Sequence, residues 1–315
     1  MSQADWEVEQ TEAGLQQVLQ KLQECRAAGD LVETGYGLLA LSYLVKWVRS
    51  DTNSPPFVRS QELALEALKT FRQTSDKIGL LNSLIVASAM TDPTTRETYL
   101  TEAESIALEL GDENKLAAVI AARARGLALS DRKAAAVLHH RALEIYRRTG
   151  NTTHQAQCLF ALSITDDSAE ERHDYALEAA QLFRSVKDPA MAAKCVQLAL
   201  MNAREFTPLG DLEDLAKQGL QDALAAGERG FPWTMYRQLS AIAAAKGNLE
   251  EMHQYRQLAD EAEAMDGLTP FERWQLDVEL TKQMIKTAKD QGDTEMVTEF
   301  KKMLKELKSD RPKKK

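Results

Sequence analysis

The chain has 315 residues, of which 44% are hydrophobic and 28% charged, so it carries enough apolar material to fold. Its formal net charge of −9 would repel nucleic-acid phosphate and anionic lipid, so we expect no nucleic acid and no membrane among its partners. No apolar run approaches the roughly 18 residues of a membrane-spanning helix, and the acidic first residues do not resemble a signal peptide. A cytoplasmic protein with reduced, buried thiols is expected, because the cysteines are few and scattered: Cys25, Cys158 and Cys195.

In chain order the hydrophobic periodicity predicts about fifteen helices and no convincing strand. Short linkers predict that neighbouring helices pack antiparallel. We expect one helical repeat domain over 1–308 and a basic, disordered tail over 309–315. The predicted helices span 7–28, 31–48, 58–74, 77–90, 94–110, 113–128, 132–149, 153–165, 168–186, 189–204, 209–226, 231–246, 249–265, 270–291 and 294–309.

Turn and capping residues mark the ends of these helices. Glycine at a helix end tolerates left-handed geometry, and the Asp or Asn that follows caps the next helix, as in Gly111-Asp112 and Gly150-Asn151. Capping boxes, in which Ser or Thr is followed three residues later by Glu, are predicted at 168–171 and 94–97.

A ten-residue block recurs along the chain. Residues 67–76 align with 142–151 and with 179–188, and a weaker copy lies at 103–112. The starting alanines are 36, 39 and 37 residues apart, and a period in this range indicates stacked helical hairpins. An aromatic recurs at one position of the block, and the residue after it is often arginine. We expect the aromatics to be core residues and the arginines to be structural: Phe71, Tyr146 and Phe183, followed by Arg72, Arg147 and Arg184, with Arg26 in the same role.

The repeat resembles the tetratricopeptide family, in a longer and more divergent form. The helix end at 142–151, followed by Ala156-x-x-Leu159-x-x-Leu162, has the pattern of that family, and Ala135-x-x-x-His139-x-x-Ala142 has its small–aromatic–small spacing with His in the aromatic place. The family's Trp-Leu-Gly start is absent, and the period exceeds its usual 34 residues.

This resemblance implies an all-α fold, a right-handed superhelical solenoid of about seven antiparallel helix pairs plus a capping helix. It also implies that the first helix of each pair lines a concave wall, that the wall binds proteins or peptides, and that the chain has no catalytic activity.

Charge is divided unequally between the two sets of helices. The six predicted helices that would line the wall hold 2 acidic and 9 basic residues, whereas the seven that alternate with them hold 24 acidic and 15 basic residues. Burial alone would deplete both signs, although Lys and Arg can also extend their charge to solvent where Asp and Glu cannot. An acid-poor wall would attract an acidic peptide.

The leading hypothesis is a non-catalytic scaffold that binds a protein or peptide, possibly acidic, and the generic scaffold is favoured over the specific acid-binding groove. The alternatives are a peptide-responsive regulatory sensor, a structural oligomer subunit and, without support from any His, Ser or Cys constellation, an enzyme. No catalytic residue, no metal site and no cofactor is expected, because no motif of those kinds occurs. The candidate partner-binding residues are Asn82, Arg123, Lys194, Asn202, Arg204 and Arg237.

Overall fold

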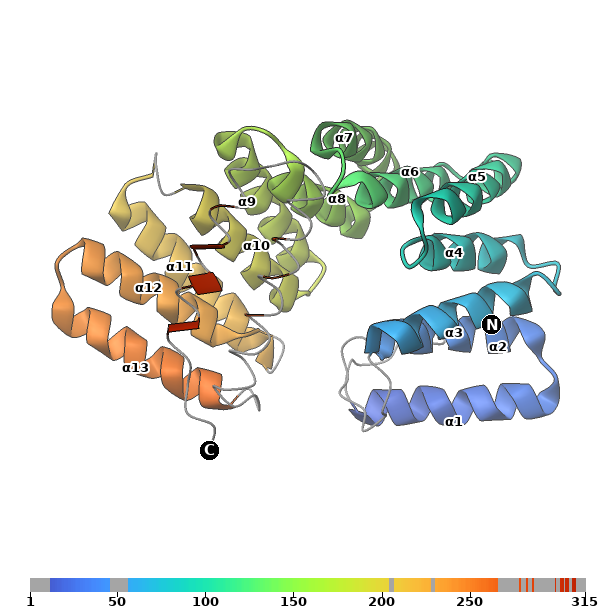
Figure 1. Ribbon diagram of the computed structural model, residues 1–315, viewed down its shortest axis with the longest axis horizontal. Coiled ribbons are helices and arrows are strands. Elements are labelled where there is room, and N and C mark those ends of the chain that lie inside the picture. Colours follow the sequence, from blue (N-terminus) through green and yellow to red (C-terminus); the bar gives the residue numbers. More distant parts are fainter. Residues whose placement is uncertain are drawn as a thin grey trace. The chain divides into compact units, whose positions relative to one another are not determined.

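The structure is a computed structural model that describes residues 12–45, 56–203, 207–227 and 230–265, with isolated positions between 278 and 309. All regular secondary structure in these residues is helical, which confirms the predicted all-α class (Figure 1). The helices predicted at 270–291 and 294–309 lie largely outside the described residues. The elements are α1 (Glu12–Ala28), α2 (Leu31–Leu44), α3 (Pro56–Phe71), α4 (Lys77–Ser88), α5 (Pro93–Leu110), α6 (Glu113–Leu127), α7 (Arg132–Thr149), α8 (Thr152–Thr165), α9 (Ala169–Ser185), α10 (Pro189–Ala203), α11 (Leu209–Ala225), α12 (Pro232–Ala245) and α13 (Leu249–Met265).

These helices belong to two compact units. Unit 1 comprises 1–127 and 137–149, and unit 2 comprises 128–136 and 150–315, so α7 contributes to both. The expected single domain over 1–308 and basic tail over 309–315 remain predictions, because most residues after 265 are not described.

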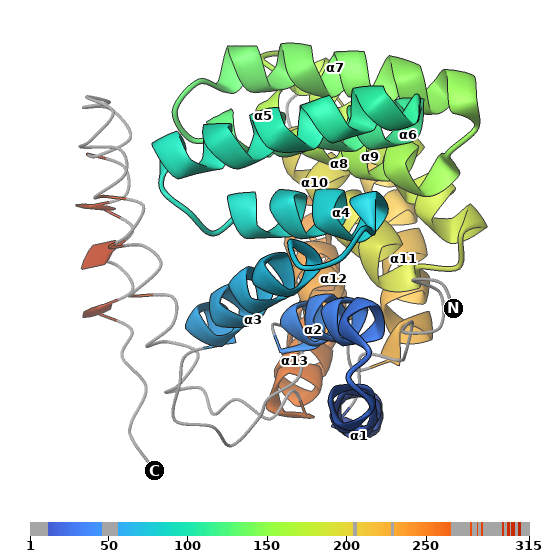
Figure 2. The ribbon, with the colours of Figure 1, turned by 90° about the vertical axis from the view of Figure 1, so that its right-hand side faces the viewer.

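Over α1 to α6 in unit 1 and α8 to α13 in unit 2, consecutive helices pack against each other in chain order (Figures 1 and 2). Three pairs of even-numbered helices also touch, since α2 lies against α4, α4 against α6, and α8 against α10. Odd-numbered helices are connected by long side chains instead. Arg26 pairs with Glu66 at 2.6 Å and Arg72 with Glu102 at 2.8 Å. The same link joins α9 to α11 in unit 2 through Arg184 and Asp222.

The turns between helices use the predicted left-handed residue. Four of them place glycine at φ between 63° and 78°, and after Gly29, Gly111 and Gly247 the next amide donates back to the carbonyl five residues earlier, as in Asp30 to Cys25 at 3.0 Å. The turn after α9 has the same hydrogen bonds, with Asp188 donating to Phe183 at 2.9 Å, but it contains Lys187 at φ 60°. A side chain with a Cβ is strained in this conformation.

Replacing Lys187 by glycine should therefore raise the free energy of unfolding by about 1 kcal/mol, measured by urea denaturation. Lys187→Ala is the matched control, since it removes the charge and keeps the Cβ. An equal gain in both variants would show that charge, and not backbone strain, limits stability at this turn.

Of the two predicted capping boxes at helix N-termini, one is present and one is wrong. The Ser168 hydroxyl accepts the Glu171 amide at 3.2 Å, as predicted. The box predicted at 94–97 is wrong, because α5 is capped by Asp92, whose carboxylate accepts the amides of Thr94 and Thr95. Pro93 occupies the first helical position, so the N-cap lies two residues earlier than the Thr–Glu pattern indicated.

The recurring aromatic is a core residue in every copy, since Phe71, Tyr146 and Phe183 are at most 2% exposed. Phe71 lies between two helices at glycine positions, because a Cβ on Gly35 of α2 or on Gly79 of α4 would overlap its ring. The ring of Tyr36 meets Phe71 edge-on at 5.1 Å between centroids. The Tyr36 hydroxyl donates to Asp76, the N-cap of α4, at 2.9 Å, and burial together with this bond raises the pKa of Tyr36.

Candidate functional site

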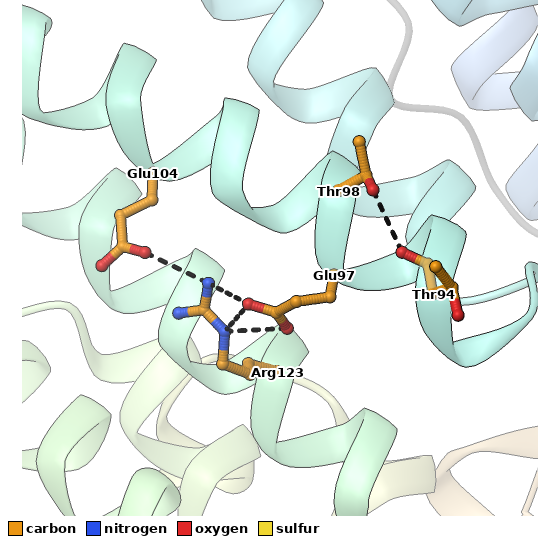
Figure 3. Close-up of polar contacts among 5 residues, drawn as sticks. All are labelled: Thr94, Glu97, Thr98, Glu104 and Arg123. Carbon is orange, nitrogen blue, oxygen red and sulfur yellow. Dashed lines mark hydrogen bonds and ion pairs between the residues drawn. The ribbon is translucent and has the colours of Figure 1, made fainter.

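The sequence assigned the recognition surface to α2, α4, α6, α8, α10 and α12, the even-numbered helices. Four of the seven basic residues that the structure describes on these segments meet carboxylates of the odd-numbered helices. Arg123 on α6 contacts two acids of α5, Glu97 at 2.9 Å and Glu104 at 3.1 Å (Figure 3). Its side chain is only 22% exposed, so its charge is satisfied inside the protein.

The same pairing occurs at three further helix contacts. Lys77 of α4 reaches Glu109 of α5 at 2.6 Å. In unit 2, Arg237 of α12 pairs with Glu263 of α13 and stacks on Trp233, its guanidinium carbon 5.3 Å from the ring centroid.

Lys246 of α12 pairs with Glu213 of α11, which also contacts Lys217 at 2.5 Å. The bonds from Lys217 and then Lys246 lower the pKa of Glu213 to about 2. The excess of bases on even-numbered helices therefore complements the excess of acids on odd-numbered helices.

Asn202 is held by three hydrogen bonds. Its amide donates to the carbonyls of Leu198 at 2.9 Å and Ser163 at 3.4 Å, and its oxygen accepts from Arg172 at 3.0 Å. These bonds tie α8, α9 and α10 together at one end. Their geometry favours a structural role.

Two lysines on even-numbered helices have a different environment. Lys115 of α6 donates to the Asn82 oxygen of α4 at 3.1 Å. Lys194 of α10 lies with its ammonium group 5.5 Å from the ring centroid of Phe160 on α8. Within the described residues, neither has a carboxylate at ion-pair distance. They are therefore held in place by neutral partners while keeping an uncompensated charge.

The candidates thus divide between the units. Asn82 and Arg123 lie in unit 1, and Lys194, Asn202 and Arg237 lie in unit 2. Arg204 falls outside the described residues. The acid-poor pattern predicts Lys194, but no sequence signal distinguishes Lys115, because its neutral partner lies 33 residues away in sequence.

Sequence reasoning also missed a set of arginines near the starts of odd-numbered helices. Arg96 of α5 donates to the carbonyls of Ser88, Thr91 and Gly126, and so caps the ends of α4 and α6. Arg172 of α9 does the same at the end of α8 through Asp166, at 2.8 Å. The recurrence of Arg at the fourth position of α5 and α9 was the available signal.

An open hollow of about 580 Å³ lies between α9 and α11 on the side of the odd-numbered helices. It is lined mainly by polar side chains, and the ion pair between Arg184 and Asp222 lies at its edge. Gln181, Gln218 and Gln221 contribute amide groups to its wall.

The buried titratable groups are suited to packing. Burial lowers the pKa of His139 to about 4, and its Nδ1 has no hydrogen-bond partner. Burial raises the pKa of the Cys195 thiol to about 12, so this thiol is unreactive at neutral pH. No group of three or more potential ligands gathers around a metal-sized space in the described part of the chain. In the same part, no helix is long and apolar enough to cross a membrane.

No protein-family model matches the chain, and no curated protein matches it. Solved structures resemble it at low identity. The apo form of RapI is 18% identical over 77% of this chain and 87% of its own, with a TM-score of 0.47. BtubC from P. vanneervenii is 15% identical over 84% of this chain and 95% of its own, with a TM-score of 0.39.

Proposed function

We propose that the chain is a non-catalytic scaffold of tetratricopeptide-like repeats that binds acidic peptide segments of partner proteins through its even-numbered helices. The observation that carries the proposal is the environment of Lys115 and Lys194. Each is positioned by a neutral group, Asn82 or Phe160, while neighbouring bases are neutralised by carboxylates. A positioned cation without an internal counter-ion attracts an anionic group from outside.

The repeat architecture supports a binding role in a second way. Within each unit, stacked hairpins present rows of side chains, and this arrangement is suited to extended peptides. The acidic remainder of the surface would repel an acidic partner elsewhere and so restrict it to the even-numbered helices.

The test compares binding of immobilised peptides rich in Asp and Glu with peptides carrying Asn and Gln in their place. Lys115→Glu combined with Lys194→Glu should weaken binding of the acidic set about tenfold or more, and leave the neutral set unchanged. Affinity of the natural protein should also fall with added salt.

Lys69→Glu combined with Lys187→Glu is the control. It gives the protein the same net charge as the test variant, but the changes lie on an odd-numbered helix and in a turn. An equal loss in both double variants would contradict the proposal, since only net charge would then matter. Circular dichroism checks that each variant keeps its helical content.

A further inference from the structure

The face that α8 and α10 share in unit 2 combines a cation with exposed apolar side chains. Lys194 and Met201 lie seven residues apart on α10 and therefore on one side of it, and Met201 is 58% exposed. Phe160 and Ile164 lie four residues apart on α8, and Ile164 is 45% exposed. We call these four residues the α8–α10 patch.

Two contacts between the helices set the order of these residues. Lys194 lies over Phe160 at one level, 5.5 Å from the ring centroid. At the other level the residues beside Met201 and Ile164 are joined, because Asn202 donates to the Ser163 carbonyl at 3.4 Å. The patch therefore has a charged end and an apolar end.

The helical rise fixes the distance between the ends. Seven residues at 1.5 Å each separate the Cα atoms of Lys194 and Met201 by about 10 Å along the helix. An extended peptide advances about 3.3 Å per residue, so three residues cover the same distance. The occupant that fits both ends carries a carboxylate and, three positions away, a large apolar side chain.

We infer that the α8–α10 patch binds an extended segment of a partner protein in which Asp or Glu stands three residues from a large apolar residue. The carboxylate pairs with Lys194, and the apolar side chain covers Met201 and Ile164. This inference rests on the proposed function and adds to it the spacing that the ligand must have.

The experiment uses capped twelve-residue peptides of serine and glutamine that carry one Asp and one Leu. Surface plasmon resonance on the full chain compares separations of one, three and six residues. The separation of three should bind about fivefold more tightly than the other two. Replacing Asp by Asn, or Leu by Ser, should each remove most of that advantage.

Variants of the protein assign the two ends. Lys194→Met should abolish the preference for Asp over Asn and keep that for Leu over Ser, whereas Met201→Ser should do the reverse. Lys69→Met, which removes an exposed lysine of α3 in unit 1 outside the proposed binding helices, should change neither preference.

The other outcomes overturn the inference in distinguishable ways. Acidic peptides that bind equally at all three separations would refute the spacing and leave the proposed function intact. If the acid-rich peptides of the earlier test also fail to bind, the proposed function fails with it. Self-association in light scattering that disappears in Met201→Ser would show that a second copy of the chain covers the patch.

Discussion

Replacing Gly79 by alanine should destabilise unit 1 by about 2 kcal/mol, although alanine favours helix more than glycine does. The new methyl group would lie 2.0 Å from a carbon of the Phe71 ring. The ring cannot move away freely, because it also approaches Gly35 of α2, where an added Cβ would lie 2.6 Å from it. Urea denaturation followed by circular dichroism measures the loss.

Two further variants test whether overlap with the Phe71 ring causes the loss of stability. Gly210→Ala is the matched control in α11, because nothing lies within 4 Å of its added Cβ, and it should leave stability unchanged or slightly raised. Phe71→Leu costs stability by itself, but the cost of Gly79→Ala should be smaller in that background. Full additivity of the two changes would show that the overlap with the ring is not the cause.

Acid should weaken unit 1 through His139 before general acid denaturation begins. This histidine is 2% exposed and its pKa falls from 6.5 to about 4, first because of burial and then because of Arg125 and the neighbouring His140. In the folded protein His139 stays neutral, whereas in the unfolded chain it becomes protonated as pH falls below 6.5. The stability that the neutral form contributes is therefore lost as pH falls, and it is fully lost only below pH 4. Between pH 6.5 and 4 the free energy of unfolding should fall by about 3 kcal/mol from this group alone.

The measurement is the difference in unfolding free energy between the natural protein and His139→Met across pH 4 to 8. Methionine has nearly the same volume and does not titrate, so the variant should gain relative stability as pH falls, by about 2 kcal/mol at pH 5. His140→Gln is the control, because His140 is exposed and its replacement should leave the pH dependence nearly as it was. A pH-independent difference for His139→Met would mean that His139 is not held neutral.

The fold was largely predictable because its signals are local. The period of the block, the glycine turns and the positions of Phe71 and Phe183 each depend on a few neighbouring residues. The Asp92 cap was missed because Thr94 and Glu97 also fit a cap, and only the hydrogen bonds distinguish them.

The sequence predicts the candidate surface by helix and not by residue. The sequence shows that even-numbered helices are rich in bases, but whether a base is free depends on partners such as Glu97, 26 residues before Arg123. Two of the six candidates, Arg123 and Arg237, are paired with carboxylates in this way. The uncompensated environment of Lys194 depends on the absence of such a partner, which no local pattern reports.

The arginine pairs between odd-numbered helices have a consequence for how the repeats could have multiplied. The copy at 67–76 carries both halves of the link, because Glu66, just before its first alanine, accepts from Arg26, and Arg72, just after its aromatic, donates to Glu102. A block duplicated in the gene would join the array at both sides without further change. At the next step both residues differ, because the copy at 103–112 has Leu108 in the arginine place and the following copy has Arg141 in the acid place. Donor and acceptor are lost together, as expected if the two positions drift as a pair.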